Sequence, residues 1–360
     1  MSFSSTGKIV GGGGSLWGMG RRQFTHTYED IISAENLLLA WGEFVRGKRK
    51  KRDVQEFQLR LMDNLLALHE DLKEGRYRHG AYEHFRISDP KPRDIHKANV
   101  RDRLLHHALY RLLYPFFDRT FIADSFSCRV AKGTHRALDR FRAFAHQVSR
   151  NHTRTVWILK CDIRKFFANI DHEVLFSILA RHIHDTDILA LLKEIIRSFR
   201  SYTHSREWFQ GVKTGVGLPL GNLTSQLLVN IYMNEFDQFV KHTLKVKHYI
   251  RYADDFVIFS EDRSRLEEMV RYIVLFLREK LRLELHPDKV FIKTIASGVD
   301  FLGWVHFPDY RVLRTATKRR MIRRLREEPS GDTIMSYIGM LSHGNTFKLR
   351  SEILPLLKRC

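Results

Sequence analysis

The sequence predicts an α+β fold in which a mostly antiparallel sheet packs on helices, and three patterns support that prediction. The first is a pair of apolar, β-prone segments, residues 249–252 and 256–259, with almost no chain between them. Such a pair is typical of a tight hairpin. The second is a strand-like apolar run at residues 156–159, and the third is apolar residues at helical spacing before and after these strands.

The first part of the chain is predicted to be a flexible leader followed by helices. Residues 1–27 include the glycine-rich stretch 11–15, whose composition is that of a flexible linker. Apolar residues between 31 and 44 indicate a first helix. A stripe from Val54 to Leu72 then predicts one long helix, opened by Asp53 and closed by Gly75. The basic run 48–52 between them is either a solvated loop or a phosphate contact.

Two adjacent carboxylates, Asp254 and Asp255, occupy the expected turn of the hairpin. One explanation is ordinary turn chemistry, because Asp favours tight turns by bonding to its own backbone. However, strands this apolar are covered by other elements, and burial disfavours negative charge unless a cation is near. We therefore expect a divalent metal at this turn.

A third carboxylate, Asp162, follows the apolar run 156–159. It either caps a helix that follows the strand or converges with the hairpin acids on a pair of Mg²⁺ ions. Metal ions held in this way activate an attacking 3′-hydroxyl and stabilise a departing pyrophosphate. The three acids therefore indicate metal-dependent phosphoryl transfer.

The motif Tyr-Ala-Asp-Asp at 252–255 is accompanied by further blocks in a fixed order along the chain. These blocks are Asp89-Pro90-Lys91-Pro92-Arg93, Cys128-Arg129, Lys132-Gly133-Thr134-His135, residues 217–226, Leu285-His286-Pro287-Asp288-Lys289 and Phe301-Leu302-Gly303-Trp304. Over roughly residues 28–345 this series resembles the reverse transcriptases, which are RNA-directed DNA polymerases. The resemblance implies a right-hand polymerase with N-terminal helices and fingers (28–155), a palm with interleaved fingers elements (156–305) and a basic helical thumb (306–360).

The resemblance also implies roles for the residues around the acids. It makes Asp162, Asp254 and Asp255 the catalytic ligands of two Mg²⁺ ions, or of Mn²⁺ in their place. Lys289 would lie near the leaving pyrophosphate, where it supplies a proton or only charge. The implied nucleotide-binding residues are Lys91, Arg93, Phe167, Leu220, Gly221 and Gln226, and the implied primer grip is Phe301, Leu302, Gly303 and Trp304.

Several of these roles have a simpler structural alternative. Phe167, five residues after Asp162, would clash with a 2′-hydroxyl and so select deoxynucleotides, or it is a packed core aromatic. Arg93 would fork onto triphosphate oxygens, with Lys91 beside it, or both belong to a solvated face. Leu220 would replace a polar contact and loosen base selection, or it only packs in its loop. The primer-grip segment could equally be simple strand packing.

The loop Leu220-Gly221-Asn222-Leu223-Thr224-Ser225-Gln226 resembles that of the diversity-generating retroelement branch. Group II intron enzymes usually carry Gln-Gly and Ser-Pro in this loop. The branch implies error-prone DNA synthesis, a small basic accessory protein oligomer and a structured noncoding RNA. Bacterial antiviral-defence reverse transcriptases share much of the palm and are the alternative, each acting with its own noncoding RNA.

The charge balance favours a nucleic-acid partner. The 360 residues contain 61 Lys and Arg against 41 Asp and Glu, a formal charge of +20. We expect a template RNA, a DNA or RNA primer and deoxynucleoside triphosphates as partners, and no membrane, because the chain has no long apolar run or secretory leader. A cytoplasmic enzyme is expected. A noncatalytic RNA-binding scaffold and a metal-dependent nuclease remain alternatives of other classes.

The segment after Pro308 is predicted to be an amphipathic basic helix. Met321, Ile322 and Leu325 provide its apolar positions. Its cations would hold the template-primer backbone through phosphate contacts that weaken as salt rises. They are Lys318, Arg319, Arg320, Arg323, Arg324 and Arg326.

Overall fold

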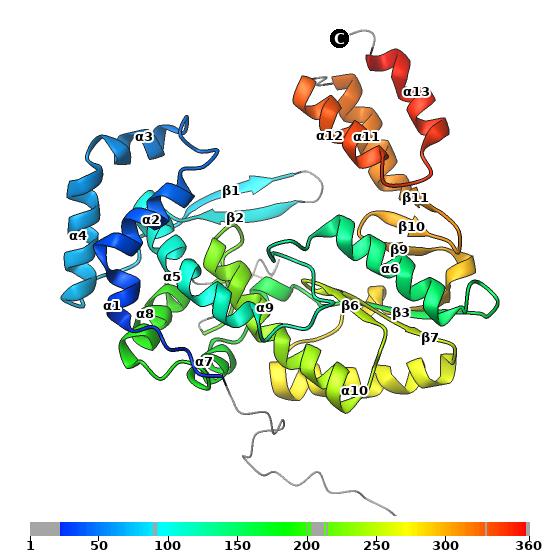
Figure 1. Ribbon diagram of the computed structural model, residues 1–360, viewed down its shortest axis with the longest axis horizontal. Coiled ribbons are helices and arrows are strands. Elements are labelled where there is room, and N and C mark those ends of the chain that lie inside the picture. Colours follow the sequence, from blue (N-terminus) through cyan, green and yellow to red (C-terminus); the bar gives the residue numbers. More distant parts are fainter. Residues whose placement is uncertain are drawn as a thin grey trace, which may run out of the picture.

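The computed structural model (Figure 1) has the predicted α+β architecture, with helices packed around mostly antiparallel strands. It describes residues 22–88, 92–199, 201–202, 212–213, 215–327 and 330–357. The glycine-rich stretch 11–15 and Lys91 lie outside these residues.

The N-terminal helices break where the sequence pattern predicted continuity. The first helix is divided at Ser33, whose hydroxyl accepts from the amide of Asn36 at 3.2 Å. The prediction of one long helix between Val54 and Leu72 was wrong, because the chain leaves helical geometry at Arg60 (φ −125°, ψ 46°). The helices on either side of Arg60 pack on different partners, α5 and α2, which a straight helix could not do. The four elements are α1 (Tyr28–Ile32), α2 (Ala34–Phe44), α3 (Arg52–Leu59) and α4 (Leu61–Lys73).

A two-stranded hairpin and two long helices follow. Strands β1 (Glu83–Ile87) and β2 (Arg93–Lys97) pair antiparallel, with Glu83 opposite Lys97. Helix α5 (Val100–Asp118) begins at Asn99, whose side chain accepts from the amide of Asp102. Helix α6 (Thr134–Val148) follows Gly133, which has φ +101°.

The central sheet has the strand order β6–β7–β3–β8, and every neighbouring pair is antiparallel. Its two faces bury separate cores, because successive side chains alternate across a strand. In β3, Leu159 and Cys161 enter the larger core while Ile158 enters the smaller one. The strands are β3 (Trp157–Asp162), β6 (Tyr249–Tyr252), β7 (Asp255–Ser260) and β8 (Phe291–Thr294).

Different helices and strands pack against the two faces of this sheet. The larger core contains residues of α7 (His172–Ala180), α8 (Thr186–Arg197), α9 (Leu223–Gln238) and α10 (Arg263–Leu281). The smaller core contains α6 and a second antiparallel sheet of β9 (Val299–Phe301), β10 (Trp304–His306) and β11 (Arg311–Leu313). The short elements are η1 (Phe166–Asn169), β4 (Ser201–Tyr202), β5 (Val212–Lys213), η2 (Phe239–Thr243), η3 (Pro287–Lys289) and η4 (Ile295–Ser297).

The chain continues into helices that stand beyond the second sheet (Figure 1). Helix α11 (Thr315–Glu327) buries Met321 and Leu325 and carries the basic residues on its other positions, as predicted. It packs against α12 (Gly331–Leu341) and α13 (Phe347–Leu357). None of the helices in the described ranges combines the length and the apolar character needed to cross a bilayer.

Candidate active site

The predicted hairpin is present, and its turn displays the two adjacent acids. Tyr252 pairs with Asp255 across β6 and β7, so Ala253 and Asp254 form a two-residue turn. Ala253 has φ +56°, in the left-handed region that such turns use. The turn therefore ends the central sheet with Asp254 at its tip and Asp255 on the first position of β7.

The third acid meets the turn at the same end of the sheet. Asp162 is the last residue of β3 and lies directly opposite Asp255 in the β3–β7 register. Just beyond it, the amide of Ile163 donates to the carbonyl of Asp254 at 3.2 Å. Carboxylates that are far apart in the chain are thus neighbours in space.

Two lysines contact these carboxylates. Lys289, in η3, donates from Nζ to Asp162 Oδ1 at 2.8 Å. Lys160 Nζ lies 3.2 Å from Asp255 Oδ1. The sequence reasoning missed Lys160, although strand alternation places it on the same side of β3 as Asp162.

Burial makes the negative charges of the acids costly. It raises the pKa of the Asp255 carboxyl to about 7, an effect that Lys160 opposes. The pKa of Asp254 is also raised, first by burial and then by the charge of Asp162. Asp255 Oδ1 is buried without a hydrogen-bond partner among the described residues, since Lys160 approaches it within ion-pair range but outside hydrogen-bond geometry.

These residues fit a hard divalent cation. Their donors are carboxylate oxygens, the ligands that Mg²⁺ prefers, and the burial that raises the pKa values of Asp254 and Asp255 makes a nearby cation favourable. In the described part of the chain no three His, Cys, Asp or Glu side chains are already arranged as a metal centre. Two of the three carboxylates are paired with lysines, Asp162 with Lys289 and Asp255 with Lys160.

A buried arginine forms a hydrogen bond with the backbone of the turn. Arg251 is fully buried and bonds to both carboxylate oxygens of Asp237, at 2.8 and 2.7 Å. Its Nη1 also donates to the carbonyl of Ala253 at 3.1 Å. Sequence reasoning missed this residue, although a cation within an otherwise apolar strand was a visible signal.

The loop before α9 packs against strand β2. The carbonyl of Leu220 accepts from the amide of His96 at 3.1 Å. Gly221 has φ +111°, and a Cβ there would lie 3.1 Å from the Ile95 side chain. Asn222 precedes α9 without a side-chain cap bond: its amide donates to the carbonyl of His96 at 3.4 Å, and its Oδ1 is buried without a partner among the described residues.

Three of the predicted nucleotide-binding residues lie on β2, η1 and α9, and one of them, Arg93, is close to the acids. Arg93, exposed at the start of β2, is near enough for its charge to oppose the rise in the pKa of Asp254. Phe167, in η1, is half-buried against the larger core, and its carbonyl accepts from the amide of Leu218 at 2.8 Å. Gln226 is half-buried in the first turn of α9.

The predicted primer-grip segment is a hairpin whose aromatic residues point inward. Leu302 and Gly303 form its turn with φ of +50° and +85°. Phe301 and Trp304 pair across β9 and β10 and are buried. For the two rings, the structure favours the strand-packing alternative, which leaves the turn as the accessible part.

The three carboxylates lie at one end of an antiparallel sheet that helices cover, an arrangement that can hold metal ions for phosphoryl transfer. The family model "Reverse transcriptase (RNA-dependent DNA polymerase)" matches residues 88–306, more than half of the chain. The chain therefore belongs to the reverse transcriptase family, a family of enzymes that use divalent metal ions.

Similar curated proteins include several bacterial relatives. Protein YkfC of Escherichia coli K12 is 27% identical, over 68% of this chain and 72% of that protein. The group II intron-encoded protein LtrA of Lactococcus lactis is 25% identical, over 64% of this chain and 46% of LtrA. The chain thus spans about half the length of the intron-encoded relative. The Retron Ec83 reverse transcriptase of Escherichia coli is 31% identical over 32% of this chain and 36% of its own.

Solved structures with some likeness include telomerase from Candida albicans. The TM-score is 0.48 at 12% sequence identity, covering 71% of this chain and 51% of that chain.

Proposed function

We propose that this protein copies an RNA template into DNA, with two Mg²⁺ ions bound by Asp162, Asp254 and Asp255. The meeting of these three carboxylates at one end of the sheet, in a chain of the reverse transcriptase family, supports the proposal. The bound metals would lower the pKa of the primer 3′-hydroxyl and neutralise charge on the pyrophosphate.

The surrounding residues would position the nucleotide. Arg93 is exposed beside the acids and can bind triphosphate oxygens through its planar fork. Lys289, which bonds to Asp162, can supply positive charge to the leaving pyrophosphate. Phe167 lies in the segment directly after Asp162, where its ring would exclude a 2′-hydroxyl.

Primer extension tests this function. With an RNA template, an annealed DNA primer, deoxynucleotides and Mg²⁺, we expect the primer to lengthen, and chelation of Mg²⁺ by EDTA to abolish lengthening. Ribonucleotides in place of deoxynucleotides should leave most primers unextended, because of Phe167. A primer that becomes shorter would instead identify a nuclease, and an unchanged primer would support a noncatalytic scaffold.

We further propose that the enzyme makes error-prone DNA in a diversity-generating retroelement, together with a small basic accessory protein oligomer and a structured noncoding RNA. The support is the loop at 220–226, whose Leu220 offers an apolar side chain where a polar one could bond to the nascent pair. The carbonyl of Leu220 in this loop accepts from the amide of His96 in β2, the strand that begins at Arg93.

The fidelity of the copy tests this role. Sequencing of DNA made on a defined RNA is expected to show frequent misincorporation, and Leu220→Gln should reduce it by roughly tenfold, the scale of a restored hydrogen bond. Leu38→Gln, at an exposed position on α2, is the control and should leave the error rate unchanged. Equal error rates in the wild type and Leu220→Gln would contradict the role given to Leu220.

A further inference from the structure

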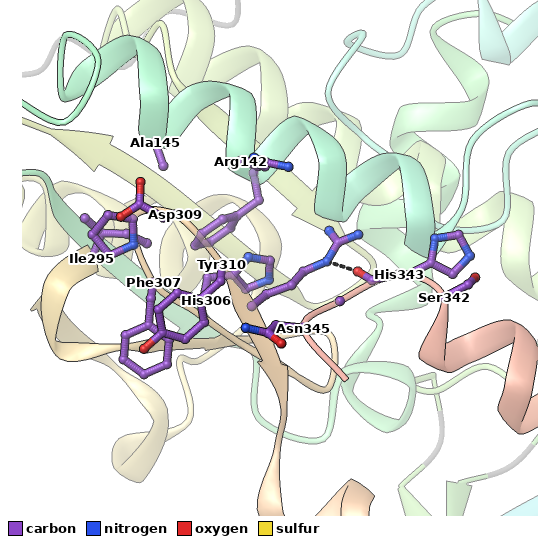
Figure 2. Close-up of a pocket in the computed structure, with 14 residues that line it drawn as sticks. Arg142, Ala145, Ile295, His306, Phe307, Asp309, Tyr310, Ser342, His343 and Asn345 are labelled. Carbon is purple, nitrogen blue, oxygen red and sulfur yellow. Dashed lines mark hydrogen bonds between the residues drawn. The ribbon is translucent and has the colours of Figure 1, made fainter. Parts of the chain in front are cut away.

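A cavity of about 400 Å³ lies outside the acidic site, between α6, strands β10 and β11 and the loop that joins α12 to α13 (Figure 2). Its size is that of a small-molecule site. It shares no residue with the acids or with the predicted primer-grip turn. The side chains that give it chemical character are Arg142, His306, Phe307, Tyr310, Arg311 and Asn345.

Positive charge is concentrated at one side of this cavity. Arg311 Nε donates to the carbonyl of His343, and Nη2 lies 3.4 Å from Asp139 Oδ1. Its remaining nitrogen, Nη1, is buried without a partner among the described residues. Burial lowers the pKa of this guanidinium, so an anion bound here would relieve an unfavourable charge.

The acids near the cavity do not cancel this charge. Asp139 and Asp309 have side chains that are 69% and 81% exposed, so solvent screens them. Arg142 lies exposed on α6 beside the same cavity. Arg142 therefore provides charge and fork geometry for a phosphate group, and Arg311 adds charge and its one nitrogen without a partner in the described part of the chain.

A histidine in the wall supplies an acceptor. His306 is only 3% exposed, and its pKa is lowered to about 3 mainly by burial, so the ring is neutral at pH 7. It bonds to the backbone of Phe301, and its Nε2 has no hydrogen-bond partner within the described ranges. A neutral ring that donates from one nitrogen has an acceptor at the other, which in His306 is the buried Nε2.

Two aromatic side chains form another part of the cavity wall. The rings of Phe307 and Tyr310 stack with centroids 4.9 Å apart and 23° between their planes. Tyr310 is 48% exposed, so part of its ring remains available to a flat ligand. A planar base would gain stacking energy on such a surface.

We propose that this cavity binds a nucleoside phosphate, with the phosphate on Arg142 and Arg311, the base against Tyr310 and a base or sugar donor on His306. The ligand is either a free nucleotide or one nucleotide unit of an RNA strand that runs outside the polymerase groove. The loop 342–345 forms part of the wall, and the amide of Asn345 donates to the carbonyl of Arg311 at 2.9 Å. A ligand bound in the cavity would therefore contact both the loop between the C-terminal helices and the second sheet.

Binding can be measured on the full chain in EDTA without deoxynucleotides, so the result does not depend on polymerisation. One arm measures adenosine 5′-monophosphate by equilibrium dialysis. The other measures ultraviolet cross-linking of a 4-thiouridine oligoribonucleotide, with the cross-linked peptide identified by mass spectrometry. We expect bound monophosphate, a cross-link within residues 306–311, or both. Bound monophosphate identifies a free nucleotide as the ligand, and a cross-link identifies a nucleotide unit of an RNA strand.

Two surface variants and a matched control decide whether the signal comes from this cavity. Arg142→Gln and Tyr310→Ala should each weaken binding or cross-linking by about tenfold, the scale of one charge-assisted or stacking contact. Both positions are exposed, so folding should be preserved. Arg271→Gln, an exposed arginine on α10, should have no effect. The proposal is overturned if neither arm gives a signal, or if the two cavity variants behave like the control.

Discussion

Asp254→Asn is expected to lower the rate of DNA synthesis by at least about a thousandfold, because a neutral amide cannot replace a carboxylate in the metal-binding role proposed for it. The substitution keeps the size and shape of the side chain in the two-residue turn. Steady-state primer extension with Mg²⁺ measures the loss. Asp63→Asn, which changes an exposed acid on α4, should retain full activity.

The same substitution should stabilise the metal-free protein, which separates a catalytic defect from a folding defect. The pKa of Asp254 is raised in the folded state by burial and by Asp162. An acid with a raised folded pKa contributes stability at low pH that is lost as the pH rises through that pKa. At pH 8 in EDTA, the amide should therefore unfold at a higher temperature than the carboxylate. Wild-type activity in Asp254→Asn would refute the metal-binding role.

Asp237→Asn is expected to reduce the free energy of unfolding by about 3 to 5 kcal/mol, because it leaves the charge of Arg251 buried without its counterion. Both side chains of this pair are 0% exposed. Tyr249 also donates to Asp237 at 2.8 Å, so a second buried bond is weakened. Urea unfolding followed by circular dichroism measures the change.

An exposed ion pair provides the contrast. Glu267→Gln breaks the pair with Arg263 on α10, whose side chains are 53% and 56% exposed, and should change stability by less than about 0.5 kcal/mol. The double variant Asp237→Leu with Arg251→Met removes both buried charges and should recover part of the loss. An Asp237→Asn protein as stable as the Glu267→Gln protein would show that the buried pair does not support the fold.

Local patterns predicted much of the palm. The hairpin at 249–260 follows from two apolar, β-prone segments with almost no chain between them, which is a property of neighbouring residues. Asp162 at the end of β3 and the amphipathic α11 were predictable in the same way. The break at Arg60 was not predictable in this way, because the spacing of apolar residues is the same in one long helix and in two shorter ones. Only the packing partners of the segment decide between one helix and two.

The sequence by itself determined the residues that can carry chemistry: acids at strand ends, a basic helix and a series of motifs typical of one family. Only the tertiary structure decided which of them meet. The register of β3 against β7 places Asp162 opposite Asp255, the approach of η3 puts Lys289 on Asp162, and the fold pairs Arg251 with Asp237. The reason is physical: propensity and periodicity act over a few residues, whereas burial and charge pairing depend on segments that only folding brings together.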